Sequence, residues 1–246
     1  MTKRVAVVTG GIGGLGTAIC RRLAADGRTV VAADLDGNPE ALQRFRDQVE
    51  GLDVHFARLD VTDFDACGSF VREVGRAHGG LDILVNNAGI TRDSTLRKMA
   101  PEQWQVLLDV NLSSAFNLCR HAVDGMVANG FGRIVNISSV SGQTGNFGQA
   151  NYAAAKAGLH GLTMSLARET AARGITVNSV SPGYIETPMT RAMPEAVRER
   201  TRSQIPVGQL GQPGDIARAV AFLSADDAGY ITGANLPVNG GLFMDY

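Results

Sequence analysis

Short apolar runs rich in β-branched residues alternate along the chain with longer amphipathic stretches. Seven of the runs are predicted as buried strands, at residues 5–9, 29–34, 54–60, 83–86, 134–138, 175–181 and 235–238. Six longer stretches are predicted as helical, at residues 15–26, 39–49, 63–78, 101–129 (one helix or two), 151–173 and 213–223. Continuously apolar strands that are followed by helices are typical of a parallel sheet covered on both faces. We therefore expect an α/β fold, a doubly wound sheet of about seven parallel strands, in a single domain over residues 1–246.

A glycine-rich turn joins the first predicted strand to the first predicted helix. From Thr9 to Gly16 the sequence reads TGGIGGLG. Glycines allow a tight turn and a close approach of the backbone to a pyrophosphate, and the helix N-terminus offers free N–H groups. Because the turn lies between a strand and a helix, it indicates a Rossmann-type dinucleotide-binding fold. The cofactor contacts expected here are Gly10, Ile12, Gly14, Leu15 and Gly16.

The second predicted strand ends in Asp34, about 20 residues after the glycine turn. An acidic residue there can accept hydrogen bonds from the adenosine ribose hydroxyls, and it would repel a 2′-phosphate. Position 13 is a glycine, not a basic residue that could hold that phosphate. Both observations favour NAD(H) over NADP(H). In the alternative interpretation Asp34 only caps the following turn, and the nearby Asp36 could share its role.

Tyr152 and Lys156 lie four residues apart in a predicted helix, so both can face one site. A phenol has an ordinary pKa of about 10, and a neighbouring ammonium lowers it toward the working pH, as general acid–base catalysis requires. Tyr152 would then protonate an alkoxide that forms as a hydride arrives. Ser139, at the end of the fifth predicted strand, could donate a hydrogen bond to the same oxygen.

Charge and composition narrow the class of protein further. The net charge of −1 and the lack of a basic tract argue against nucleic acid or an anionic membrane as a partner. There is no signal-peptide pattern and no apolar run long enough to span a bilayer, so we expect a cytoplasmic protein. The three cysteines are far apart and the four histidines are scattered, so no metal site is predicted.

The motifs together resemble the short-chain dehydrogenase/reductase family over the whole chain. They are the turn at residues 9–16, the NNAG sequence at residues 86–89, Asn111, Ser139, Tyr152, Lys156 and the PGYIET sequence at residues 182–187. The resemblance implies Tyr152 as the acid/base, Lys156 as its partner and ribose ligand, Ser139 on the carbonyl and Asn111 on a water in a proton relay. It also implies cofactor contacts from Asp60, Val61, Asn87, Ala88, Gly89, Pro182, Gly183, Ile185 and Thr187.

Within that family, the chain resembles two kinds of reductase that act on 3-oxoacyl thioesters. One reduces acetoacetyl-CoA to (R)-3-hydroxybutyryl-CoA for polyhydroxybutyrate synthesis; the alternative acts in fatty-acid synthesis on groups held by acyl carrier protein. The sequence favours the short CoA substrate. The expected substrate contacts are Asp93, Asn146, Phe147, Gln149 and Tyr184, with Asn146 in place of an expected glutamine. A protein on this fold that senses nucleotides without catalysis is a remote alternative.

Two further expectations come from the resemblance. The segment at residues 188–204, which carries Met189, Arg191 and Met193, would be a lid over the substrate, whereas the alternative is an ordinary surface helix. The chain would form a homotetramer. One interface would use the helices around residues 111–127 and 151–173, and the other would use residues 236–246.

Overall fold

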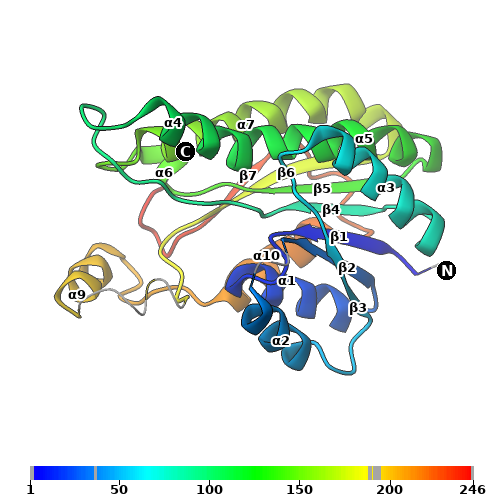
Figure 1. The fold of residues 1–246 in the computed structure, drawn as a ribbon, viewed down its shortest axis with the longest axis horizontal. Coiled ribbons are helices and arrows are strands. Elements are labelled where there is room, and N and C mark those ends of the chain that lie inside the picture. Colours follow the sequence, from blue (N-terminus) through cyan, green and yellow to red (C-terminus); the bar gives the residue numbers. More distant parts are fainter. Residues whose placement is uncertain (1–2, 36–37, 188–189, 191–194, 245–246) are drawn as a thin grey trace.

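A computed structural model describes residues 3–35, 38–187, 190 and 195–244, and within them seven parallel strands form one sheet (Figure 1). The strands are β1 (Val5–Thr9), β2 (Thr29–Asp34), β3 (Val54–Arg58), β4 (Ile83–Asn86), β5 (Gly132–Ile137), β6 (Ile175–Pro182) and β7 (Asn235–Val238). Their order is β3-β2-β1-β4-β5-β6-β7. The chain therefore winds outward from β1 in one direction and then returns to wind from β4 in the other. The predicted doubly wound Rossmann-type α/β fold is confirmed.

Helices cover both faces of the sheet (Figure 1). On one face lie α1 (Gly14–Ala25), α2 (Pro39–Gln48) and α10 (Pro213–Leu223). On the other lie α3 (Phe64–His78), α4 (Pro101–Leu108), α5 (Ser114–Asn129) and α7 (Ala150–Thr170), which ends in a 3₁₀ turn, η2 (Ala171–Arg173). The short helix α6 (Ser141–Thr144) was not among the predicted elements, whereas α9 (Glu195–Gln204) lies in the segment for which a surface helix was the alternative to a lid.

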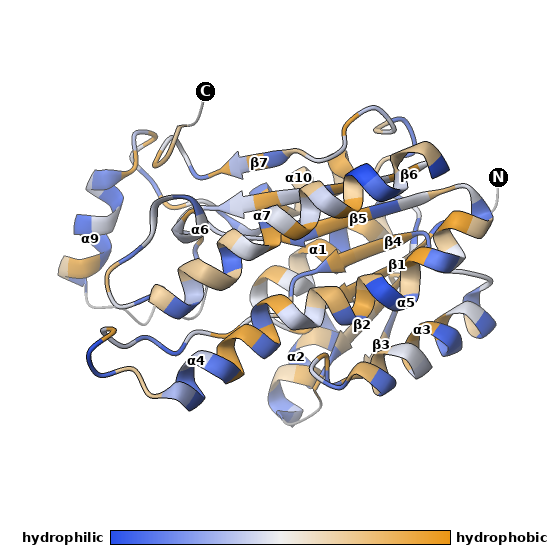
Figure 2. Cartoon of the chain, turned by 90° about the horizontal axis from the view of Figure 1, so that it is seen from above, coloured by the Kyte–Doolittle hydropathy of each residue, from blue (hydrophilic) through white to orange (hydrophobic). Residues whose placement is uncertain are grey.

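Two apolar cores lie between the sheet and its helices, as the hydrophobic strands inside and the polar outer helix faces in Figure 2 show. Alternate residues of a strand point to opposite faces. In β1, Ala6 and Val8 enter the core under α1 and α10, whereas Val5 and Val7 enter the core under α3 and α5. A central strand covered on both sides therefore has to be apolar at every position, which explains its continuous apolar run.

The long helical stretch at residues 101–129 divides at a π-helical turn. This turn, η1 (Asp109–Ser113), separates α4 from α5. Such a turn inserts one residue into the helix and is frequent at functional sites. It places Asn111 in the interior, where the side chain is 2% exposed. The apolar periodicity continues across the turn, so the sequence predicted the helices but not the irregularity between them.

Candidate active site

The carboxyl ends of the strands open into a cleft of about 670 Å³. It lies where the winding reverses between β1 and β4, the place where open parallel sheets bind ligands. Segments that follow β1, β2, β4, β5 and β6 meet there. Most predicted cofactor residues line it: Gly10, Gly14, Leu15, Gly16, Asp34, Asp60, Val61, Asn87, Ala88, Gly89, Tyr152, Lys156, Pro182, Gly183 and Thr187.

The glycine turn forms one end of the cleft. A Cβ atom at Gly16 would overlap the carbonyl oxygen of Gly10, which itself has a left-handed φ of +62°. The Asn87 amide donates to the carbonyls of Thr9 (2.9 Å) and Gly10 (3.1 Å) and so holds the turn in place. No side chain caps the start of α1 at Gly13. The backbone amides of this first turn are therefore available to an anionic group.

Asp34 lies at the mouth of the same end. Its carboxylate accepts hydrogen bonds from the backbone N–H groups of Ile12 (3.2 Å) and Leu35 (2.8 Å). Burial raises the pKa of this carboxyl, and the two backbone hydrogen bonds oppose the rise. Asp34 therefore links the end of β2 to the glycine turn and still faces the cleft. Asp36, which could share its role, lies outside the described residues.

Two predicted cofactor residues do not line the cleft. Ile12 packs its side chain against the core beside α1, and only its backbone reaches Asp34. Ile185 is buried and lines a second cavity instead. There it meets Gly211, where a Cβ atom would lie 2.7 Å from the Ile185 Cδ1 atom. In this structure, both side chains therefore lie next to the cleft without lining it.

Tyr152, Ser139 and Lys156 come together on the floor of the cleft. Ser139 follows β5, and its hydroxyl is close enough to the Tyr152 phenol to lower the pKa of that group. The Lys156 Nζ atom donates to the Ile137 carbonyl at 2.8 Å and lies 5.6 Å from the centre of the Tyr152 ring. Ser139 also accepts from the Ser141 backbone N–H at 3.1 Å, which orients its hydroxyl. The arrangement puts a phenol, a hydroxyl and an amine around one point.

The predicted direction of the Tyr152 pKa is wrong for the protein alone. Burial raises the pKa of the phenol, the Ser139 hydrogen bond lowers it by less, and the charge of Asp93 raises it further. Burial also lowers the pKa of the Lys156 ammonium to about 8. The helical spacing brings the two groups to one site, and that site is buried. Loss of hydration there disfavours both the phenolate of Tyr152 and the ammonium of Lys156.

Asn111 lies behind the cleft, within reach of Lys156. Its side chain accepts from the Ile90 N–H at 2.8 Å and donates to the Ile90 carbonyl at 2.9 Å. A Cβ atom on Gly89 would lie 3.5 Å from Lys156 Nζ and 3.6 Å from Asn111 Oδ1, so both polar side chains face the side of Gly89 that has no side chain. The π-helical turn thus brings Asn111 close to the other three predicted catalytic residues.

Three of the five predicted substrate contacts form a hydrogen-bonded group beside the cleft. Gln149 Nε2 donates to Asp93 at 3.0 Å. Gln149 Oε1 accepts from Asn146 Nδ2 at 2.9 Å and from Ser141 Oγ at 3.2 Å. Asn146, which stands in place of an expected glutamine, therefore orients Gln149. The group ties the loop after β4 to the start of α7.

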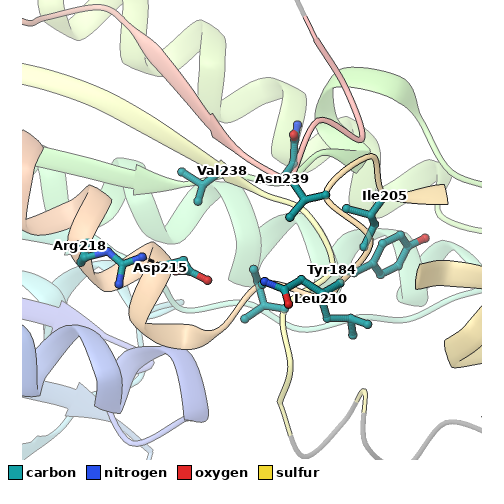
Figure 3. Close-up of a pocket in the computed structure, with 12 residues that line it drawn as sticks. Tyr184, Ile205, Leu210, Asp215, Arg218, Val238 and Asn239 are labelled. Carbon is teal, nitrogen blue, oxygen red and sulfur yellow. Dashed lines mark hydrogen bonds and ion pairs between the residues drawn. The ribbon is translucent and has the colours of Figure 1, made fainter. Parts of the chain in front are cut away.

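The other two predicted contacts, Phe147 and Tyr184, do not flank the cleft together. Phe147 is 90% exposed, because its loop turns at Gly145 and Gly148 with left-handed φ angles of +71° and +75°. Tyr184 lines the second cavity, of about 320 Å³, beside Ile205 and Leu210 (Figure 3). In this structure, neither aromatic ring therefore lines the cleft that holds Tyr152.

Several residues that line the cleft were not predicted. Each lies within two positions of a predicted site residue, so proximity in sequence to those residues was the signal that could have found them. They are Gly13, Ala33, Leu35, Leu59, Thr62, Ile90, Thr91, Val110, Ile137 and Ser138.

The remaining sequence expectations concern the lid, the cysteines, a membrane span and a metal site. Positions 188–189 and 191–194 of the expected lid lie outside the described residues, and its later part forms α9, which has no buried residue. Cys20, Cys67 and Cys119 are buried, and burial raises the pKa of each thiol. Within the described ranges, no helix is long and apolar enough to cross a membrane, and no cluster of three metal-ligating side chains occurs.

Comparison with known proteins gives the family. The family described as enoyl-(acyl carrier protein) reductase matches residues 10–243. The chain is 55% identical to an acetoacetyl-CoA reductase of Allochromatium vinosum, over 98% of this chain and 99% of that one. It is 49% identical to an acetoacetyl-CoA reductase of Cupriavidus necator, over 99% and 100% of the two chains. It is 46% identical to a 3-oxoacyl-[acyl-carrier-protein] reductase of Vibrio cholerae, over 98% of each. With this similarity over nearly its full length, and with Tyr152, Lys156 and Ser139 together in the cleft, the chain belongs to the short-chain dehydrogenase/reductase family of NAD(P)H-dependent oxidoreductases.

Proposed function

We propose that the chain reduces the 3-keto group of acetoacetyl-CoA to give (R)-3-hydroxybutyryl-CoA, with NADH as the hydride donor. The observation that carries the proposal is the meeting of Tyr152, Ser139 and Lys156 on the floor of the cleft. The relatives at 55% and 49% identity are named acetoacetyl-CoA reductases, and this similarity supports the choice of substrate.

The cleft fits a nicotinamide dinucleotide. A side chain at Gly16 would overlap the Gly10 carbonyl, so the turn presents only backbone at the place where a pyrophosphate would lie. Gly14, Leu15 and Gly16 would hold the pyrophosphate, Asp34 the adenosine ribose, and Lys156 the second ribose. When bound, the cofactor supplies the hydride. We also propose main-chain contacts from Ile185, and contacts from Thr187, at the nicotinamide end.

The residues of the protein orient the ketone and deliver a proton. Ser139 and Tyr152 would each donate a hydrogen bond to the 3-keto oxygen, which places that oxygen within reach of the phenol. Tyr152 transfers its proton to the oxygen as negative charge develops there. Lys156 stabilises the resulting phenolate, and a water held near Asn111 would return the proton. The hydrogen-bonded group of Asp93, Asn146 and Gln149 would support the acyl chain.

Asp34 supports NADH over NADPH. Its carboxylate lines the cleft at the end of β2, and its two backbone hydrogen bonds hold it there. A 2′-phosphate at this position would meet the like charge of Asp34, and the adjoining Gly13 and Leu35 carry no charge. The basic residue that the fold brings to this strand end is Arg58, which lies in register with Asp34 across β2 and β3.

The charged surface offers basic side chains to a CoA substrate. Arg133, a basic residue at the start of β5 that could dock an acidic carrier protein, is 3% exposed and donates to the carbonyls of Gly174, Ala225 and Asp226, so it cannot serve in docking. By contrast, Arg92, Arg97 and Lys98 are exposed on the loop that follows Thr91 at the cleft. They would meet the CoA phosphates. Arg168 and Arg173 are also exposed and remain candidates for docking a carrier protein. Reduction of 3-oxoacyl groups on a carrier protein is the second candidate, because relatives at 46% identity carry that name.

We infer a homotetramer from the apolar side chains exposed on three neighbouring helices. Trp104 of α4, Phe116 of α5 and Met164 of α7 are 36%, 52% and 52% exposed. Exposed apolar groups gathered on one face are typical of a subunit interface. The second interface proposed from the sequence would use residues 236–244 together with the final two residues, which lie outside the described ranges.

The test is steady-state kinetics with acetoacetyl-CoA and either NADH or NADPH, compared as kcat/KM at one pH. We expect turnover with both cofactors and a clear preference for NADH. Turnover with NADPH alone would contradict the cofactor proposal and leave the reductase standing. Turnover only of 3-oxoacyl groups on a carrier protein would establish the second candidate.

A further inference from the structure

A buried series of hydrogen bonds connects the side chain of His160 to the backbone of Lys156. His160 lies one helical turn after Lys156 in α7, and its ring bridges two strands. Its Nε2 atom is 3.1 Å from the hydroxyl of Ser138, at the end of β5, and its Nδ1 atom is 3.2 Å from the hydroxyl of Ser179 in β6. The Ser138 hydroxyl donates in turn to the Lys156 carbonyl at 2.8 Å. None of these contacts belongs to the proposed reaction steps.

Proton counting, together with the bond lengths, assigns the direction of these hydrogen bonds. A serine hydroxyl has one proton, and a carbonyl oxygen can only accept. Since the Ser138 proton goes to the Lys156 carbonyl, Ser138 Oγ can only accept from His160. The neutral ring must therefore carry its proton on Nε2 and accept at Nδ1 from Ser179. This requires the Ser179 hydroxyl to turn to His160 Nδ1 and away from the Asn235 side-chain oxygen, which lies 3.0 Å from it. We choose this arrangement because the Ser138–Lys156 contact is the shorter of the two, and because the Asn235 oxygen still accepts from Ser181 at 2.8 Å.

The opposite tautomer of His160 would interrupt this series of hydrogen bonds between Ser138 and Lys156. With the proton on Nδ1, the Ser138 hydroxyl would turn toward Nε2, and the Lys156 carbonyl would lose its second hydrogen bond and keep only the one within α7. Burial lowers the pKa of His160, so the ring is neutral at neutral pH and one tautomer has to be selected. Ser138 adjoins Ser139 at the cleft, but it is only 2% exposed, so its hydroxyl has little contact with bulk water that could replace a lost bond.

We propose that His160 is a positioning residue for Lys156. Its Nε2–H group donates to Ser138, which directs the Ser138 proton onto the Lys156 carbonyl and so fixes α7 against the end of β5. Lys156 is then held at both ends by β5, through its carbonyl at Ser138 and through its Nζ atom at Ile137. This keeps the amine in register with Tyr152 and Ser139. The kinetic consequences of this inference rest on the proposed function, whereas the tautomer of His160 does not depend on it.

Substitution of His160 by an amide side chain can distinguish the roles of its two ring nitrogens. In His160→Gln, the amide reaches the position of Nε2 and can donate to Ser138; in His160→Asn, it reaches only the position of Nδ1 and Ser179. His160→Leu removes both contacts. We expect His160→Gln to keep kcat within about twofold of the wild type and the other two variants to lose roughly three- to tenfold, the effect of one hydrogen bond. The KM for acetoacetyl-CoA should not change, since His160 does not line the cleft.

A pair of serine variants provides the matched control. Ser138→Ala removes the link to Lys156, whereas Ser179→Ala removes the contact at the other ring nitrogen. We expect the kcat of Ser138→Ala to fall as in His160→Leu, and that of Ser179→Ala to stay near the wild-type value. Equal losses in the two serine variants, or better rescue by His160→Asn than by His160→Gln, would overturn the proposal.

Two readouts need no acyl substrate. Long-range ¹H–¹⁵N NMR identifies the protonated ring nitrogen, and His160→Gln assigns the signal among four histidines. The dissociation constant for NADH should rise in Ser138→Ala and His160→Leu, because Lys156 would hold the ribose. A wild-type protein that fails to reduce acetoacetyl-CoA would refute the proposed substrate, and these readouts would still decide the role of His160. A proton on Nδ1 would refute that role.

Discussion

At the residue scale, Lys156 combines a proposed function with a cost in stability. Its amine is buried, its hydrogen-bond acceptor is the Ile137 carbonyl, and burial lowers its pKa from 10.5 to about 8. Such shifts occur where a site needs an amine that changes charge near neutral pH. The same shift makes the stability of the folded chain depend on pH.

Lys156→Met should stabilise the protein at neutral pH while abolishing activity. Below the folded pKa of about 8, both states carry the charge and the folded state bears the full desolvation cost, on the order of 3 kcal/mol. Between about 8 and 10.5 the unfolded chain binds the extra proton, so the wild-type stability rises with pH. The Tm of the variant should exceed that of the wild type at pH 7, and the difference should shrink as the pH approaches 10.5. A difference that does not vary with pH, or that also occurs in the exposed control Lys98→Met, would refute this account.

Tyr152→Phe should reduce kcat by roughly 10²–10⁴-fold, the usual contribution of a general acid. The phenyl ring keeps the packing, so the dissociation constant for NADH should stay within about twofold, since the hydroxyl makes no large contribution to binding. Binding is measured by titration of the cofactor fluorescence. Full activity in this variant would remove Tyr152 as the proton donor.

Asp34→Asn should weaken selection for NADH. The amide can still accept from the Ile12 N–H group, but it loses the charge that would bind ribose hydroxyls and repel a phosphate. We expect kcat/KM for NADH to fall roughly ten- to a hundredfold, as for hydrogen bonds to a charged group, and the ratio of NADH to NADPH to fall with it. Asp63→Asn, the same change at the N-cap of α3, should leave the ratio unchanged. An unchanged ratio in Asp34→Asn would disprove the role of this carboxylate.

At the element scale, the start of α1 shows how the packing of a turn outweighs helix propensity. Alanine normally stabilises a helix relative to glycine by about 0.4–1 kcal/mol. Gly16→Ala should do the opposite, because its methyl group would overlap the Gly10 carbonyl. We expect a lower Tm and weaker NADH binding, both measured by thermal shift with and without cofactor.

The matched control is Gly75→Ala in α3, where nothing lies within 4 Å of the added methyl group. This variant should gain stability and keep its affinity for NADH. If Gly16→Ala behaves like Gly75→Ala, the close approach at the glycine turn is not needed for binding.

The helix around Asn111 shows what element-level prediction missed. A run of helical periodicity at residues 101–129 was evident, but the π-helical turn at Asp109–Ser113 was not. Its cause is tertiary, since Asn111 exchanges two hydrogen bonds with Ile90 after β4. A local pattern cannot predict a distortion that a residue 21 positions away helps to hold.

At the scale of the whole molecule, the exposed apolar side chains on α4, α5 and α7 predict assembly. Phe116→Asp places a charge in the proposed interface, where it would lose its hydration without a partner. The wild type should sediment as a tetramer and the variant as a smaller species. Val197→Asp, on the exposed helix α9, should leave the assembly intact. A monomeric wild type would rule out the proposed interface.

Local chemistry in the sequence determined the fold class, the glycine turn, Asp34 and the Tyr152–Lys156 pair. These depend on strand and helix periodicity and on residue spacing, which are short-range properties. Ser139 was predicted from its place at a strand end, and the parallel sheet brings such ends together. The substrate contacts were less predictable: Phe147 turns into solvent, and Tyr184 faces a second cavity.

Only the tertiary structure decided how these groups behave. Burial, which spacing alone does not report, reverses the expected direction of the Tyr152 pKa and lowers that of Lys156. It also makes Arg133 a structural residue instead of a docking cation, and it places His160 between two serines from separate strands. The sequence determines which groups are present and how they repeat along the chain. The packing of distant segments determines their hydration and their hydrogen-bond partners, because both depend on contacts that no local pattern contains.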